Sequence, residues 1–207
     1  FLPEHQRKNG YAPVDVKTAY AATEYAEKTA LRETDRATYQ AMEALVHNLN
    51  TMNSRAGAQV PFSSLNYGTD TTPEGRMAIR NLLKATEAGM GDGETPIFPV
   101  QIFKVKEGVN YNEGDPNYDL FKAAMRCSAK RLFPNFSFLD APFNLQYYKP
   151  GDYNSEVAYM GCRTRVMGNT HDPEREITCG RGNLSFTSIN LPRLGIEAKG
   201  NIERFYE

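Results

Sequence analysis

The chain has 207 residues, with 24 basic against 25 acidic side chains and a net charge of −1, which is the length of one domain or at most two. This balance argues against a surface for nucleic acid or for anionic membranes. Hydrophobic residues make up 40%, enough for a core, but no run approaches the ~18 apolar residues of a membrane-spanning helix, and the start lacks the features of a signal peptide.

The first part of the chain is predicted to be helical. Residues 14–34 and 35–50 are interpreted as two helices, since alanine and leucine recur at helical spacing in the second and Thr34 or Asp35 can cap it. Strand character begins soon after. Residues 58–65 (AQVPFSSL) fit a short strand whose proline is tolerable only at an edge or a bulge.

Helices and strands then alternate along the middle of the chain. Thr72, followed by a proline and a glutamate, predicts the capped start of a helix that runs to about Thr86. Residues 97–105 (IFPVQIFKV) are rich in β-formers and predict a buried strand. A helix is expected over 119–131 and a strand over 135–139.

The last third predicts a strand–turn–strand unit around Cys162, a strand over 184–191 and a helix that begins after Gly200. Strands separated by helices indicate a parallel α/β sheet. Several strands are apolar on both faces, as in sheets that are covered on two sides. The expected fold is therefore an α/β barrel, or about half of one.

The chain holds three cysteines, Cys127, Cys162 and Cys179. An odd, sparse count without close pairs does not indicate a disulfide framework, so a reducing cytoplasm is expected. A disulfide between Cys162 and Cys179 stays open, and Cys127, within a predicted helix, is expected to be a small buried residue. The three histidines lack the spacing of metal ligands, and no metal site is predicted.

Residues 159–166 (YMGCRTRV) set one cysteine apart. Gly161 allows a sharp bend, so Cys162 would lie at the tip of a hairpin. If the backbone stays extended, Arg163 and Arg165 lie on the side opposite the sulfur, yet two nearby arginines would also suit a thiolate nucleophile. No histidine base lies nearby in sequence, and a hairpin cysteine that merely packs is the alternative.

A second candidate region is the polar loop over residues 53–65 (NSRAGAQVPFSSL), which joins a helix to a strand. Its hydrogen-bonding side chains would suit a ligand in an α/β crevice. The alternative is a capped helix end with solvated polar residues. Residues 68–75 (GTDTTPEG) could hold an anion at a helix amino terminus, but a plain N-cap is the better interpretation.

These stretches resemble a known family. Residues 53–64 (NSRAGAQVPFSS), 159–163 (YMGCR), 180–184 (GRGNL) and 188–193 (SINLPR) are similar to the central part of the anaerobic, class III ribonucleoside-triphosphate reductases. These are oxygen-sensitive glycyl-radical enzymes. The resemblance runs over most of the chain, and together the stretches are highly specific, whereas MGCR alone would be weak.

The resemblance implies a ten-stranded α/β barrel with a central finger loop, here around residues 157–168. Cys162 would be the thiyl-radical residue at the tip, which removes hydrogen from C3′ of the ribose in an enclosed site. Asn183 matches an active-site asparagine that hydrogen-bonds substrate or reductant. Thr164 replaces a glutamate of the aerobic relatives, as in the subgroup that takes its electrons from formate. Arginines beside the finger are then expected to pair away from the sulfur.

The resemblance also implies binding residues and partners. Asn53, Arg55 and Gln59 are carried over as substrate contacts, while Ser63 and Ser64 would reach phosphate or ribose. The whole chain, residues 1–207, would be an internal segment of a longer protein that is inactive alone and contains no cofactor. The parent enzyme would need a glycyl radical installed by a radical SAM activating enzyme, formate, and a structural zinc outside this segment. It would bind ribonucleoside triphosphates and nucleotide effectors, and form a homodimer.

Two other functions remain as alternatives. Another glycyl-radical enzyme would share the barrel and the central cysteine. However, the formate-lyase type has adjacent cysteines at the tip and the dehydratase type a glutamate two residues after the cysteine, whereas residues 161–164 read GCRT. The second alternative is a non-catalytic nucleotide-binding module. It predicts that this segment binds nucleotides without any radical partner.

Overall fold

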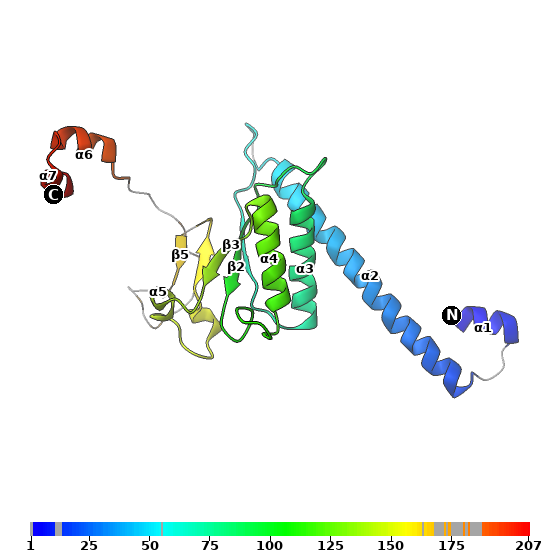
Figure 1. Ribbon diagram of the computed structural model, residues 1–207. Helices are drawn as coiled ribbons and strands as arrows, with labels where there is room; N and C mark the ends of the chain where they lie inside the picture. The colour runs from blue at the N-terminus through cyan, green and yellow to red at the C-terminus, as the bar shows by residue number, and fades with distance from the viewer. Residues whose placement is uncertain are drawn as a thin grey trace.

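The chain forms a parallel α/β unit with helical extensions at both ends (Figure 1). The computed structural model describes residues 2–10, 14–54, 56–162, 164–167, 172, 174, 180, 182 and 188–207. A three-stranded sheet has the order β1 (Ser64–Tyr67), β2 (Val100–Val105), β3 (Asn135–Phe138), and both pairs are parallel. The helices α3 (Pro73–Ala88) and α4 (Tyr118–Arg131) connect these strands. The predicted α/β class is confirmed.

The hydrophobic core lies between the sheet and these two helices. Phe103 of β2 is fully buried, and its ring packs against Tyr67, Phe121 and Phe136 at centroid distances of 5.7, 6.2 and 6.1 Å. Burying a side chain of this kind stabilises the fold by about 1.5–3 kcal/mol. The other buried members of the core come from α3, β2 and α4: Ile79, Leu83, Val105, Leu120, Ala124 and Cys127.

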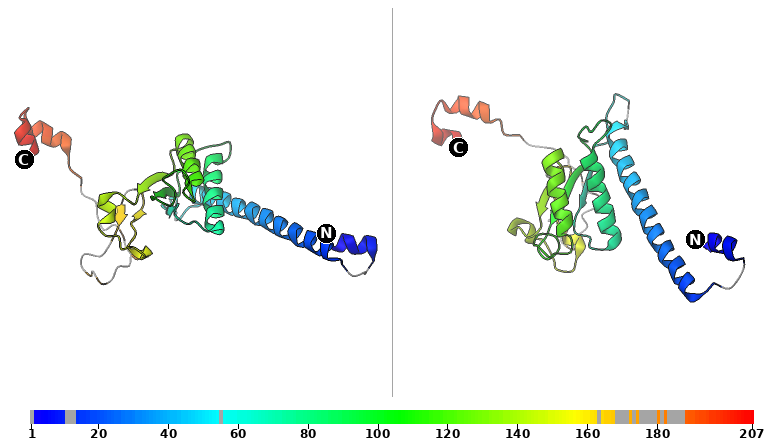
Figure 2. Two further views of the ribbon diagram at one scale, coloured as in Figure 1. Left: turned by 60° about the horizontal axis from the view of Figure 1, so that its bottom comes forward. Right: turned by 45° about the vertical axis from the view of Figure 1, so that its right-hand side comes forward.

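The amino-terminal region is one long helix, α2 (Val16–Thr51), so the prediction of two helices was wrong. Asp15 caps it by accepting a hydrogen bond from the Thr18 N–H at 2.8 Å. Asp35 does not start a helix, because its carboxylate accepts a bond from the Asn81 amide of α3 at 2.9 Å. Packing against α3 therefore keeps α2 continuous at Asp35, a residue that could have capped a new helix. Figure 2 shows the first turns of α2 extending away from the sheet.

Two strands begin later than predicted, because a proline precedes each of them. The strand predicted over 58–65 corresponds to β1, which begins only at Ser64, after Pro61. Likewise β2 starts at Val100 rather than at residue 97, since Pro99 has no N–H to donate. The other predicted helices and the strand at 135–139 are confirmed within two residues, and Thr72 caps α3 by accepting a hydrogen bond from the Gly75 N–H at 3.1 Å.

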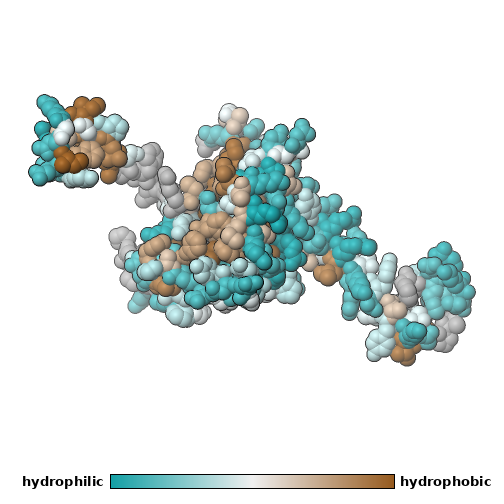
Figure 3. Space-filling model, viewed as in Figure 1, coloured by the Kyte–Doolittle hydropathy of each residue, from teal (hydrophilic) through white to brown (hydrophobic). Residues whose placement is uncertain are grey.

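In the carboxyl-terminal part, the structure describes residues 188–207 as one continuous stretch. Of the strand predicted over 184–191, residues 184–187 lie outside the described residues, and Leu191 belongs to a helix, α6 (Leu191–Ala198). Asn190 caps this helix through the Arg193 N–H at 3.0 Å. A second helix, α7 (Ile202–Tyr206), confirms the helix expected after Gly200. Figure 3 shows apolar side chains on the surface of this helix pair.

Four short helical elements among the described residues were not predicted: α6, α1 (Leu2–Asn9), α5 (Pro142–Leu145) and the 3₁₀ helix η1 (Tyr153–Ser155). None of the helices described for this chain is long and apolar enough to cross a membrane.

Candidate functional site

The cysteine singled out by the sequence lies at the tip of a hairpin. Its strands, β4 (Ala158–Met160) and β5 (Thr164–Val166), pair antiparallel, with Met160 opposite Thr164. Gly161 and Cys162 follow β4 directly. Gly161 has φ +66°, a conformation that favours glycine. The predicted strand–turn–strand unit is confirmed, and Cys162 carries a free, exposed thiol at its tip.

The hairpin is attached to the face of β1 that the helices leave uncovered. Side chains alternate along a strand, so Tyr67 faces α3 and α4 while Ser64 and Asn66 face the other way. Asn66 binds the backbone of Tyr159 in both directions. Its Nδ2 donates to the Tyr159 carbonyl at 2.7 Å, and its Oδ1 accepts from the Tyr159 N–H at 2.8 Å.

Two further contacts reach the residue just before the cysteine. The Gly161 N–H donates to Ser64 Oγ at 3.2 Å. The ring of Phe62 lies so close to Gly161 that an added Cβ would meet Phe62 Cε1 at 3.3 Å. Phe62 itself packs edge-on against Phe98 at 5.1 Å between ring centroids. The finger is therefore held immediately before the sulfur.

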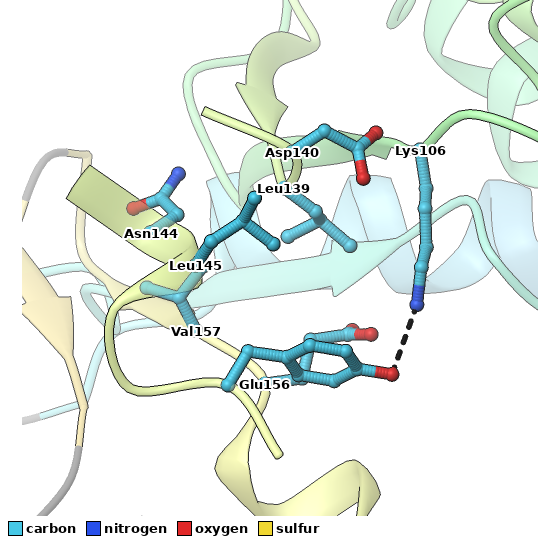
Figure 4. A pocket seen from close by; sticks show the side chains of 8 residues that line it. Lys106, Leu139, Asp140, Asn144, Leu145, Glu156 and Val157 are labelled. Carbon is cyan, nitrogen blue, oxygen red and sulfur yellow. Dashed lines mark hydrogen bonds between the residues drawn. The ribbon is translucent and has the colours of Figure 1, made fainter. Parts of the chain in front are cut away.

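An ion pair ties the base of the hairpin to the central strand. Lys104 Nζ of β2 lies 2.6 Å from Glu156 Oε1, and the two side chains are only 14% and 11% exposed. Glu156 and Val157 also border a pocket with Lys106, whose ammonium donates to the Tyr148 hydroxyl at 3.2 Å (Figure 4). This pocket measures about 10 Å³, which is room for about one water molecule, so it is no site for a nucleotide.

The helix-free face of the sheet is more polar than expected. The sequence predicted strands that are apolar on both faces, and β2 is indeed buried over five of its six residues. On β1 and β3, however, this face presents Ser64, Asn66 and Ser137. Ser137 is 2% exposed, and its hydroxyl has no hydrogen-bond partner among the described residues.

The other predicted site residues divide into two groups. Asn53 and Gln59 lie exposed in the loop between α2 and β1. The Ser54 N–H and hydroxyl both donate to the Gln59 carbonyl, at 2.6 and 2.9 Å, which closes the loop on itself. Ser63 is half-buried, and its hydroxyl donates to the Pro61 carbonyl at 3.3 Å.

The second group lies outside the described residues: Arg55, Asn183, Arg163 and Cys179. Arg165, by contrast, is described. Its guanidinium lies over the Phe143 ring at 4.9 Å and donates to Asn144 Oδ1 at 3.2 Å. Arg165 thus contacts α5. Among the described residues, no group of three His, Cys, Asp or Glu side chains is placed to bind a metal.

Sequence reasoning missed Asn66 and Glu156. Asn66 stands two residues after Ser64 and four after Phe62, so period-two alternation puts all three on one side of the strand. That alternation was the available signal. Glu156 carries no local signal, because its partner Lys104 is 52 residues away.

Fold and site together define a class of protein: a parallel α/β domain that holds a thiol at the tip of a hairpin on its helix-free face. The family model for anaerobic ribonucleoside-triphosphate reductase matches residues 10–207. The chain belongs to this family.

Curated relatives agree with this assignment. The anaerobic ribonucleoside-triphosphate reductase of Haemophilus influenzae is 36% identical over 81% of this chain and 22% of its own length. That of Escherichia coli is 32% identical over 88% of this chain and 25% of its own. That of Enterobacteria phage T4 is 35% identical over 80% and 27%. The chain spans about a quarter of the length of these relatives.

Proposed function

We propose that this chain supplies the finger loop and part of the substrate barrel of an anaerobic ribonucleoside-triphosphate reductase. The parent enzyme reduces ribonucleoside triphosphates to 2′-deoxyribonucleotides. One observation carries the proposal: a free cysteine lies at the tip of a hairpin anchored on the helix-free face of a parallel α/β sheet. Family membership supports it.

In the proposed chemistry, Cys162 acts as a hydrogen-atom carrier. A glycyl radical elsewhere in the parent would take the hydrogen atom of the Cys162 S–H bond, which leaves a thiyl radical on the sulfur. The sulfur would then take the hydrogen from C3′ of the ribose, so that an S–H bond forms as the C3′–H bond breaks, and it would return that hydrogen to C3′ once the 2′-hydroxyl has been replaced. Formate is the reductant: with one proton it replaces the 2′-hydroxyl by hydrogen and leaves carbon dioxide and water. The contacts of Arg165 with Phe143 and Asn144 suit this role, because a hydrogen-atom donor needs a neutral thiol.

The remaining parts of the site belong to the same proposal. Asn183 would orient the substrate, while Asn53, Arg55, Gln59 and Ser63 remain predicted substrate contacts. Since Cys162 is exposed here, enclosure of the radical is assigned to the three quarters of the relatives that this chain does not cover. A ten-stranded barrel with a finger over residues 157–168 would provide it.

The wider setting is proposed from the family as well. The parent would be a cytoplasmic homodimer that responds to nucleotide effectors, is activated by a radical SAM enzyme and holds a structural zinc elsewhere. Free thiols on Cys127 and Cys162 support a reducing compartment.

Replacing the finger cysteine tests the proposal. Cys162→Ala in the full-length parent should abolish deoxyribonucleotide formation, because alanine cannot carry a hydrogen atom. The glycyl radical should still be installed and visible by electron paramagnetic resonance. Cys127→Ala is the matched control, since Cys127 is buried in α4, and it should keep most of the turnover. Normal turnover by Cys162→Ala would refute the proposed function.

A further inference from the structure

Three alternate residues of one segment contact the finger just before its sulfur. Phe62, Ser64 and Asn66 reach the stretch from Tyr159 to Gly161. We call these three the holding stripe. The hydrogen bonds among these contacts join positions 93 to 97 residues apart, so they are features of the folded chain and not of the hairpin itself.

Asn66 makes the strongest contact of the holding stripe. In an antiparallel pair, alternate residues turn both backbone groups toward the partner strand or away from it. Tyr159 turns both of its groups to Asn66, at 2.7 and 2.8 Å. The side-chain amide thereby replaces a neighbouring strand and satisfies the open edge of β4. Two parallel bonds to one residue fix both its position and its orientation.

Ser64 and Phe62 act one step closer to the sulfur. Ser64 Oγ accepts a hydrogen bond from the Gly161 N–H at 3.2 Å, and the Phe62 ring comes within 3.3 Å of the position that a Cβ at Gly161 would take. The backbone is thus held at Tyr159 and again at Gly161, on either side of Met160. Cys162 follows directly, so these two points determine the direction in which the tip leaves the sheet.

We propose that Asn66 and Ser64 are positioning residues, which hold the Cys162 sulfur at the distance needed for hydrogen-atom transfer. This inference rests on the proposed function. Neither residue touches the reacting atoms; both act through the backbone of Tyr159 and Gly161. Transfer of a hydrogen atom depends steeply on distance, and a displacement of about 1 Å in an active site can slow a reaction about 100-fold.

For Ser64 this positioning role differs from the predicted contact with phosphate or ribose. Its oxygen is used by the Gly161 N–H, on the side of the strand that faces the finger. Both polar atoms of the Asn66 side chain are likewise engaged with Tyr159. Functional sites need such a supporting layer, because reacting groups on loops are otherwise held too loosely.

The first test is Asn66→Asp in the full-length, activated enzyme. The substitution keeps the shape and the acceptor for the Tyr159 N–H, but it places a carboxylate oxygen against the Tyr159 carbonyl. We expect kcat to fall about 10- to 100-fold, with KM changed less than about twofold, because the finger is displaced and substrate contacts are not. The isotope effect with 3′-deuterated substrate should increase, and the glycyl radical signal should remain.

Two further variants complete the series. Ser64→Ala should lower kcat in the same way, while Ser64→Thr, which keeps the hydroxyl, should restore most of it. Asn154→Asp is the matched control, since Asn154 is exposed in η1, and it should leave both kcat and KM unchanged. If Asn66→Asp does not fold, Ser64→Ala and Ser64→Thr give the same readouts.

The outcomes separate the two proposals. An unchanged kcat and isotope effect, with only a lower melting temperature, would make Asn66 a structural contact and overturn the inference. A raised KM at constant kcat would make it a substrate ligand, which also overturns it. Cys162→Ala is measured alongside: if that variant retains turnover, the proposed function itself fails. If it is inactive while Asn66→Asp is normal, only the positioning role is lost.

Discussion

At the scale of single residues, two described cysteines have opposite environments. Cys162 is exposed at a glycine-bent tip, whereas Cys127 is fully buried between α4 and the sheet. The Cys127 thiol donates a weak hydrogen bond to the Leu83 carbonyl at 3.7 Å. Burial, with a smaller contribution from Glu87, raises the pKa of the Cys127 thiol to about 11. One cysteine therefore exposes its thiol at the surface, whereas the other contributes to the hydrophobic core.

A pH-dependent reactivity follows for Cys127. With a pKa of about 11, only about one thiol in a thousand is ionised at pH 8, and the thiolate is the reactive form. Iodoacetamide should leave Cys127 of the native full-length enzyme unmodified at pH 8, as measured by peptide mass spectrometry. Labelling should begin only as the pH approaches 11, or when the protein is unfolded. Rapid labelling at pH 8 in the native state would contradict the burial.

At the scale of elements, the hairpin depends on β1 and β2 rather than on its own short strands. Two strands of three residues each are too little to be stable alone in water. Asn66 of β1 and Lys104 of β2 supply the missing partners. The parallel sheet thus supports the hairpin and its tip.

Removing one partner of the Lys104–Glu156 pair should loosen the hairpin. Glu156→Gln leaves a largely buried ammonium without its carboxylate, which costs about 3–5 kcal/mol in buried pairs. Amide hydrogen exchange of the peptide over residues 156–162 in the full-length enzyme should become at least about tenfold faster, since ~1.4 kcal/mol is tenfold.

A double variant and a surface pair provide the controls. Lys104→Met combined with Glu156→Leu should exchange more slowly than Glu156→Gln, because no unpaired charge remains. Glu197→Gln breaks the Arg193–Glu197 pair of α6, whose side chains are 73% and 51% exposed. Because exposed ion pairs contribute little, amide hydrogen exchange of the peptide that contains this pair should change by less than about threefold. Equal effects of Glu156→Gln and Glu197→Gln would show that burial of the first pair contributes nothing.

At the scale of the whole molecule, the described residues form an open parallel α/β sheet with a hairpin on one face. Within the described residues, β1 and β3 are the edges of the three-stranded sheet, and the finger tip is exposed. Apolar side chains such as Leu191, Ile196 and Ile202 are exposed on the α6–α7 pair. The proposed radical chemistry would need a closed, largely apolar chamber, and the remaining parts of the parent enzyme would have to complete it.

We therefore expect the isolated 207-residue chain to be inactive. Given ribonucleoside triphosphate and formate, it should form no deoxyribonucleotide, and calorimetric titration should detect only weak nucleotide binding. Far-ultraviolet circular dichroism would first establish that the chain is folded. Tight nucleotide binding by this chain would instead favour the non-catalytic nucleotide-binding module.

The sequence by itself determined the features that depend on neighbours along the chain. The Thr72 cap, the alternation of helices and strands, and the glycine bend before Cys162 each follow from residues within a few positions. The residues that carry the family resemblance also stand in the sequence itself. For these features, local backbone preference and the surrounding structure agree.

Only the tertiary structure decided the rest. Packing on α3 turned a candidate cap at Asp35 into the middle of a helix. The Asn66 amide donates to the carbonyl of Tyr159, 93 residues away, and no local sequence pattern predicts a contact between such distant residues. Hydrogen bonds and burial between distant segments exist only after folding brings them together, so the support of the finger became visible only in the folded chain.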